Sequence, residues 1–197
     1  MLKRARWNSV TLCTALMLLA ACSKPAPEPS PHSAPAAGVD YHSFANTEDF
    51  RTTHIDLDFT VDFERRVLIG EARLHLERQN EANNPLVLDT RDLAIESVRA
   101  GRDDVFADVS FSMGKNSDDL GAPLIVEMPA DATTVVIRYE TAPDALALQW
   151  LEPQQTAGKR HPFLYTQAQS IHARSFIPLQ DTPGVRITYD ATVRTPP

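Results

Sequence analysis

The sequence predicts an all-β domain, arranged as an antiparallel sandwich or a curved pair of sheets. Three observations lead to this fold class. Short runs of residues alternate between apolar and polar side chains, which is the period of a strand with one buried face. Polar turn clusters separate these runs, as at residues 101–104 and 114–119. No stretch has the longer apolar period of an extended helix, so the pattern is not that of an α/β protein.

The amino terminus has the pattern of a signal peptide spanning residues 1–21. Lys3, Arg4 and Arg6 precede an apolar run over residues 10–21. Because a membrane-spanning helix needs about 20 predominantly apolar residues, this run is too short for a permanent transmembrane anchor. We therefore expect the protein to be exported and this segment to be removed.

The apolar run ends in Leu19-Ala20-Ala21-Cys22, which resembles the lipobox of bacterial lipoproteins. This resemblance implies that the chain is cut before Cys22 and that Cys22 becomes lipidated. Ser23 stands where an aspartate is associated with retention in the inner membrane. The expected location is therefore the cell envelope, on the outer membrane facing the periplasm. The alternative is ordinary signal-peptide cleavage, which would leave Cys22 as an unmodified thiol.

Residues 22–39 are rich in proline and alanine and predict a disordered tether ahead of a folded domain of residues 40–197. The formal net charge of −7 becomes more negative once the basic signal peptide is removed. An acidic domain is a poor partner for nucleic acid, so we expect none, and we expect membrane attachment through acyl chains alone. Loss of Cys13 leaves a single cysteine, which excludes an internal disulfide in the mature chain.

The first two strands are expected to form a hairpin. Residues 54–63 alternate without a fault, residues 64–66 supply a polar turn, and residues 67–76 place their apolar side chains on one face. Further strands are expected at 85–88, 94–98, 105–111, 124–128, 133–139, 163–166, 171–177 and 185–193. Single helical turns are possible at 49–53 and 145–150. The closing Thr195-Pro196-Pro197 has a composition typical of a domain junction, because a proline pair cannot continue a sheet interior.

Several stretches carry a more specific pattern than alternation alone. They are 54–57, 61–63, 65–70, 86–93, 147–151, 155–159, 161–165, 167–174 and 178–183. Together they resemble the zinc aminopeptidase family, and within it the branch of leukotriene hydrolase and aminopeptidase B. The resemblance implies a saddle-like β-domain that packs against a thermolysin-like catalytic domain and forms one wall of the substrate cleft.

The same resemblance assigns substrate contacts to Gln167, Ala168 and Gln169, which match a family segment that touches the amino-terminal residue and backbone of a bound peptide. An amide offers a donor and acceptors, so it can pair with a peptide without adding a charge. Read without the resemblance, the two glutamines would satisfy backbone groups at a strand end. Ser170, the fourth expected substrate contact, replaces the small apolar residue usual in the leukotriene hydrolase branch, and its hydroxyl could add a hydrogen bond or merely be tolerated. Peptide cleavage is therefore implied, and fatty-epoxide processing is not carried over.

No catalytic or metal-binding residue is expected within this chain. The family holds zinc through His-Glu-x-x-His and a further glutamate, and this motif is missing from the sequence, as is Gly-x-Met-Glu-Asn. An unrelated site of His161, His172 and Asp181 would have a spacing that matches no known ligand pattern. Zinc is therefore expected in a downstream catalytic domain, which with the peptide substrate and the membrane makes up the expected partners.

The aromatic residues Trp150, Phe163, Tyr165 and Phe176 gather late in the sequence, and one or two of them could face the catalytic domain. The function implied is that of a non-catalytic amino-terminal domain of an exported zinc metallo-aminopeptidase. It would contribute cleft wall and substrate contacts, and the chain alone would be inactive. The rival is a free-standing lipoprotein module that uses the β-domain for binding or as a scaffold.

Overall fold

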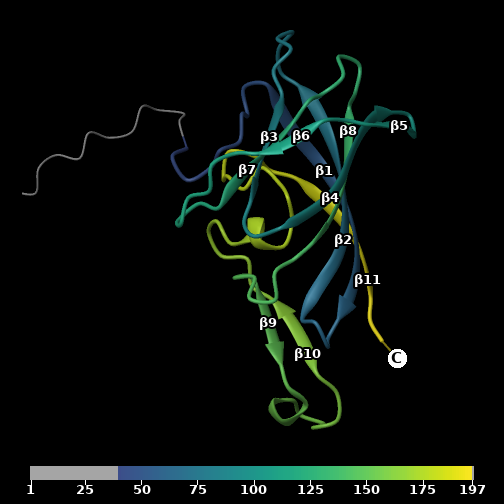
Figure 1. Ribbon diagram of the computed structural model, residues 1–197, viewed down its shortest axis with the longest axis vertical. Helices are drawn as coiled ribbons and strands as arrows, with labels where there is room; N and C mark the ends of the chain where they lie inside the picture. The colour runs from purple at the N-terminus through teal and green to yellow at the C-terminus, as the bar shows by residue number, and fades with distance from the viewer. Residues whose placement is uncertain (1–39, 197) are drawn as a thin grey trace, which may run out of the picture. The chain divides into compact units, whose positions relative to one another are not determined.

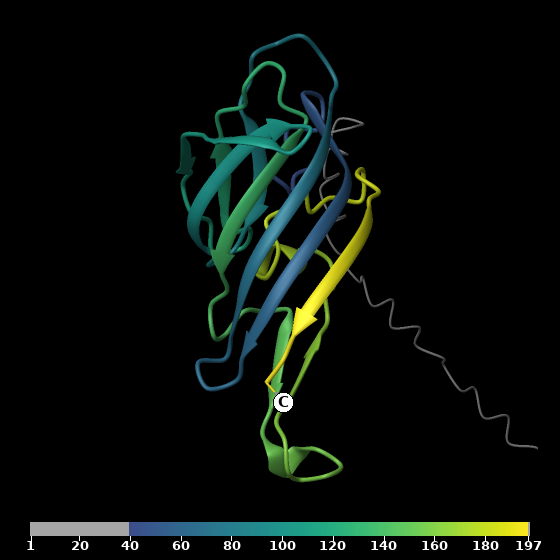
Figure 2. The same cartoon turned by 90° about the vertical axis from the view of Figure 1, so that its right-hand side faces the viewer.

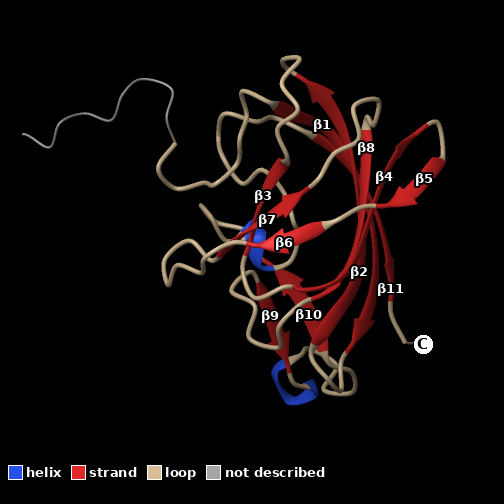
Figure 3. Ribbon diagram, turned by 45° about the horizontal axis from the view of Figure 1, so that its top comes forward, coloured by secondary structure: helices blue, strands red, loops and turns tan. Residues whose placement is uncertain are grey.

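A computed structural model of the chain describes residues 40–196, and nearly all of its regular structure is β-strand (Figures 1 and 3). The strands are β1 (Phe50–Asp62), β2 (Val67–Arg78), β3 (Leu86–Thr90), β4 (Ala94–Arg102), β5 (Val105–Asp108), β6 (Phe111–Met113), β7 (Ala122–Val126), β8 (Thr134–Glu140), β9 (Leu148–Leu151), β10 (Phe163–Thr166) and β11 (Thr188–Arg194). Two short 3₁₀ helices, η1 (Pro153–Gln155) and η2 (Ala173–Ser175), complete the described part. The predicted all-β class is confirmed.

The largest sheet has six strands in the order β11-β1-β2-β8-β4-β5. The predicted hairpin supplies two neighbouring strands of this sheet, since β1 and β2 pair antiparallel over almost their whole length. Arg66 takes a left-handed φ of 56° in the turn between them. The exception to antiparallel pairing is β11, which lies parallel to β1 at the edge of the sheet (Figure 2).

Two smaller sheets accompany the large one. Strands β3, β7 and β6 form an antiparallel sheet of three strands, and β9 and β10 form a separate hairpin. In Figures 1 and 2 this hairpin extends away from the other strands, toward the side on which β11 ends. The segment that follows β10 is thereby placed beside the inner face of the large sheet.

Apolar side chains from the inner faces of the two larger sheets form one core. Its most buried members are Phe50, Ile55, Leu74, Leu86, Leu88, Leu124, Val126, Val135, Ile137 and Tyr139. The Tyr139 hydroxyl donates to the carbonyl of Phe176 at 2.8 Å, and complete burial raises the pKa of the phenol. Gly70 permits this packing, because a Cβ there would lie 2.8 Å from Cζ of Tyr139. The core thus ties the large sheet to the loop that carries η2.

Four sequence predictions need correction. Residues 171–177 form a turn and η2 instead of a strand, because the backbone there curves around a buried arginine, Arg174. The turn expected at 49–53 gives way to β1, which already begins at Phe50. Within 145–150 the last residues join strand β9, which had not been predicted. The single strand expected at 105–111 is divided between β5 and β6, which belong to different sheets.

Candidate substrate-contact segment

Residues 167–170, here called the contact segment, follow directly after β10, and all four are exposed. Backbone hydrogen bonds hold the segment at Gln167 and at Gln169. The Gln167 N–H donates to the carbonyl of Ala147 at 2.9 Å, and the Gln169 carbonyl accepts from the His172 N–H at 2.9 Å. The main chain is therefore fixed at the end of the hairpin, while the side chains face solvent.

Neither glutamine side chain makes a hydrogen bond to another residue of the described range 40–196. The reading in which these amides satisfy backbone groups at a strand end has no support in this arrangement. Ala168, Gln169 and Ser170 instead border a hollow of about 650 Å³, which is completed by Asp40, His42, Ile171, Asp181, Thr182 and Pro183. The amide of Gln169 is thus available to a ligand placed in the hollow, whereas Gln167 is exposed just before it.

The contact segment is supported by a buried guanidinium. Arg174 has no exposed surface, and its Nε donates to Oδ2 of Asp181 at 3.0 Å. Its two terminal nitrogens donate to backbone carbonyls, Nη1 to Leu120 at 3.0 Å and Nη2 to His42 at 2.7 Å. Oδ1 of Asp89 lies 3.4 Å from Nη1. Four parts of the chain that are distant in sequence therefore contact this one side chain. Such a network fixes the loop beneath the contact segment.

Asp89 is the buried carboxylate of this network. Burial raises the pKa of Asp89, and four partners oppose the rise by favouring the charged form: the Ser43 hydroxyl, the Phe44 N–H, the charge of Arg174 and the Asp181 N–H. Ser43 Oγ donates at 2.5 Å, the Phe44 N–H at 2.7 Å and the Asp181 N–H at 2.9 Å. Because these three donors all pair with its carboxylate, Asp89 acts as a structural anchor for the segments that carry them.

Backbone strain is located immediately after the contact segment. Ile171 has a φ of 61°, a left-handed conformation that is rare for a β-branched residue. Such strain persists only where the surroundings impose it, and it clusters at ligand-binding positions. Here η2 and the Arg174 network supply the constraint on the following residues. The contact segment therefore has a defined direction relative to the hollow.

The other candidate site residues lie apart. His161 is exposed in the loop between β9 and β10, His172 precedes η2, and Asp181 is engaged by Arg174. Among residues 40–196 the structure instead brings together one group of possible metal ligands, His54, Asp56 and Asp190. Sequence spacing could not reveal it, because Asp190 reaches β1 only through the parallel pairing of β11. Cys22 lies outside the described residues.

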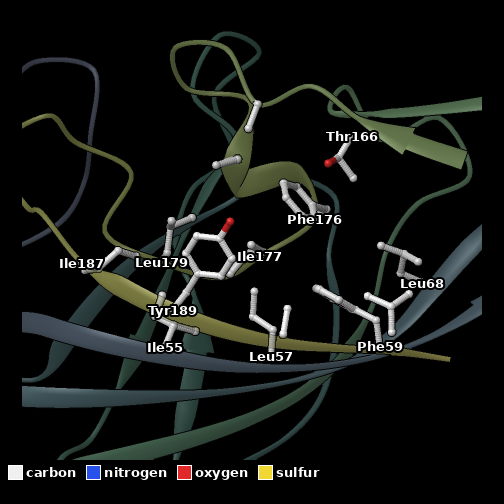
Figure 4. A pocket seen from close by; sticks show the side chains of 14 residues that line it. Ile55, Leu57, Phe59, Leu68, Thr166, Phe176, Ile177, Leu179, Ile187 and Tyr189 are labelled. Carbon is white, nitrogen blue, oxygen red and sulfur yellow. The ribbon is translucent and has the colours of Figure 1, made fainter.

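An apolar groove of about 410 Å³ lies between the inner face of β1 and β11 and the η2 loop (Figure 4). Figure 4 shows the aromatic ring of Tyr189 between Leu179 and Ile177, and Phe176 on the η2 side, facing Leu57 and Phe59 of β1. Phe163 and Tyr165, on β10, are also exposed, at 53% and 42%. Trp150, by contrast, packs edge-on against Phe63 with ring centroids 5.7 Å apart. Neither short helix of the described part is long or apolar enough to cross a bilayer.

These features define a class of protein: an all-β domain of three sheets whose last hairpin carries a fixed segment with free amide side chains. The profile of the Peptidase M1 N-terminal domain family matches residues 51–197. The chain belongs to this family, as the resemblance in the sequence implied.

Curated relatives and solved structures agree with the assignment. The chain is 38% identical to a leukotriene A-4 hydrolase of Xenopus laevis over 163 residues, covering 80% of this chain and 26% of the relative. It is 34% identical to a leucine aminopeptidase 2 of Phaeosphaeria nodorum over 162 residues, covering 80% and 25%. The native LTA4 hydrolase structure from yeast superposes with a TM-score of 0.73 at 31% identity, covering 87% of this chain and 26% of that one.

An M1 zinc metallopeptidase from Deinococcus radiodurans, at 18% identity and a TM-score of 0.58, shares the fold over 79% of this chain and 35% of its own. The chain thus spans about a quarter of the length of the curated relatives that it matches.

Proposed function

We propose that the chain is the non-catalytic amino-terminal domain of an exported zinc metallo-aminopeptidase that removes amino-terminal residues from peptides. The observation that carries this proposal is the contact segment, in which the Gln167 and Gln169 amides are exposed and unpaired within residues 40–196 and Gln169 borders a hollow. Membership of the M1 family supports the parent activity. The amide pair supports a direct part in holding the substrate.

The chemistry of the contact segment suits the end of a peptide. The amide oxygen of Gln169 can accept from an ammonium group, and its NH₂ can donate to a peptide carbonyl. Because the amide is neutral, it holds the substrate without fixing a second charge in the cleft. Peptide substrates are favoured over fatty epoxides, since Ser170 adds a polar group where the leukotriene hydrolase branch has an apolar one.

The apolar surfaces support a neighbouring domain. Phe163 and Tyr165 lie on the same face of β10, and Tyr189 borders the apolar groove. Exposed aromatic side chains of this kind are typical anchors of an interface. In this proposal they contact the catalytic domain, which supplies the zinc ligands, the general base and the groups that stabilise the transition state.

The proposed place of the enzyme is the outer membrane, through a lipid on Cys22 and the tether of residues 22–39. The support for this is the sequence pattern Leu19-Ala20-Ala21-Cys22 at the end of an apolar run. A free-standing lipoprotein module is the competing outcome. Reading the gene past codon 197 separates the two, because a following His-Glu-x-x-His fits only the enzyme.

The test of the proposed substrate contact is Gln169→Ala in the full-length enzyme. We expect kcat/KM for an aminoacyl substrate to fall roughly ten- to a hundredfold, the effect of losing a hydrogen bond worth about 1–3 kcal/mol. Gln169→Glu is expected to retain more activity than Gln169→Ala, because a carboxylate still accepts from an ammonium group.

Gln154→Ala is the matched control, since Gln154 is exposed at the tip of the same hairpin and away from the hollow. It should leave both kcat/KM and the melting temperature unchanged. Equal kcat/KM of wild type and Gln169→Ala, at the same melting temperature, would show that Gln169 does not bind the substrate and that the domain acts only as a scaffold.

A further inference from the structure

A cluster of histidine and aspartate side chains lies on the outward face of the large sheet. His54 and Asp56 are two residues apart on β1, so they point to the same side, opposite the buried Ile55. His75 on β2 is the register partner of His54, and Asp190 on β11 is the register partner of Asp56. Three strands therefore contribute to one group, here called the outer-face cluster.

The distances within the outer-face cluster match the ligand spacing of a tetrahedral metal site. Nε2 of His54 lies 3.3 Å from Oδ1 of Asp56 and 3.5 Å from Oδ2 of Asp190. All three ligand atoms lie within 4.8 Å of one another. Zinc binds nitrogen and oxygen at about 2.0–2.1 Å, which places adjacent tetrahedral ligands roughly 3.3–3.4 Å apart. A single ion can therefore contact all three residues after a small closure between the carboxylates.

The imidazole of His54 is oriented for metal binding. Nδ1 lies 2.7 Å from Oγ1 of Thr188, and that hydroxyl donates to the carbonyl of Thr53 at 3.5 Å. Oγ1 is therefore placed to accept a hydrogen bond from Nδ1–H, which leaves the lone pair of a neutral ring on Nε2. This lone pair faces two carboxylates, so the arrangement calls for a cation at their centre or a proton on the ring.

Nearby arginines do not neutralise the two carboxylates. Arg73 is the register partner of Asp56 on β2, but its Nη1 donates to Asp104 at 2.9 Å. Arg194 forms an ion pair with Asp58, two residues further along β1 than Asp56, so it does not neutralise Asp56 either. Within residues 40–196 the only charged partners of Asp56 and Asp190 are histidines. Two aspartates beside a neutral imidazole carry the charge that a divalent ion balances.

We propose that His54, Asp56 and Asp190 bind a divalent transition-metal ion, with zinc as the ion that this donor set fits. His75 acts as a positioning residue, because its Nε2 lies 2.7 Å from Oδ2 of Asp56 and turns Oδ1 toward His54. Calcium and magnesium are disfavoured, since they take six or more oxygen ligands and avoid imidazole. An ion bound here would fasten edge strand β11 to β1.

The experiment measures zinc bound by the 197-residue chain, prepared without a polyhistidine tag, by titration calorimetry with zinc chloride and by metal analysis after dialysis. The cluster is expected to hold about one zinc ion per chain and to raise the melting temperature when zinc is added. Asp190→Ala should lose this ion and the rise in melting temperature. Because the side chain of Asp190 is 86% exposed, its removal leaves the folded sheet intact.

His161→Ala is the matched control, because it removes an exposed histidine outside the cluster and should bind zinc as the wild type does. Cys13 and Cys22 are present in all variants, so a zinc ion held by thiolates would be retained in every one. The proposal is overturned if the wild type binds no more zinc than Asp190→Ala. It is equally overturned if the loss follows His161→Ala, or if His54→Asn keeps both the ion and the thermal shift.

Discussion

At the scale of single residues, the support of the contact segment depends on Arg174. Its guanidinium is buried with Asp89 and Asp181, and every hydrogen-bonding nitrogen has a partner or a nearby carboxylate. Removing one member of a buried ion pair leaves the other without compensation and costs about 3–5 kcal/mol. Arg174 therefore links folding stability to the geometry of the neighbouring glutamines.

We expect Arg174→Met to lower the free energy of unfolding by about 3–5 kcal/mol, measured by urea denaturation of the chain. Arg186→Met is the control, since Arg186 is exposed, and it should change the stability by less than about 0.5 kcal/mol. A small effect of Arg174→Met would mean that Asp89 becomes neutral in the variant, which its raised pKa would favour.

At the scale of elements, the hairpin of β9 and β10 exposes Phe163 and Tyr165, which in the proposed function contact a catalytic domain. We expect the double change Phe163→Ser and Tyr165→Ser to lower the melting temperature of the full-length enzyme, because buried aromatic anchors contribute about 2 kcal/mol or more each. The isolated 197-residue chain should keep its melting temperature, as both side chains are exposed there.

Val105→Ser is the comparison for the hairpin, because Val105 is 78% exposed on a different edge strand and lies outside the proposed interface. An equal drop in melting temperature for the double variant and for Val105→Ser, in the full-length enzyme and in the 197-residue chain alike, would contradict the proposed contact between the domains.

Elements with strict alternation were predictable from the sequence, and the β1–β2 hairpin is the clearest case. Prediction failed where tertiary contacts decide the conformation. Residues 171–177 contain β-favouring side chains, but the acceptors for Arg174 lie elsewhere in the chain and impose a turn with η2. The same limit applies to sites. The contact segment was predicted from a family resemblance. The outer-face cluster was not predicted, because it depends on which strands become neighbours in the sheet, and the local sequence pattern does not encode strand order.

At the scale of the whole molecule, the remaining prediction concerns where the protein resides. Cys22→Ala is expected to leave the precursor uncut or soluble and to remove it from the membrane fraction. Cys13→Ala is the control, because Cys13 lies within the apolar run of the expected signal peptide and outside the proposed lipobox. Fractionation and the mass of the processed chain check both results. Normal processing with membrane retention of Cys22→Ala would exclude the lipobox.

The parallel pairing of β1 with β11 has a consequence for the order in which the molecule is made. His54 and Thr188 are 134 positions apart, so β1, the first strand of the domain to leave the ribosome, waits for β11 to be made before it obtains its edge partner. Contacts so distant in sequence form slowly, because a long loop must close first. Until then β1 is an open edge, able to pair with another chain.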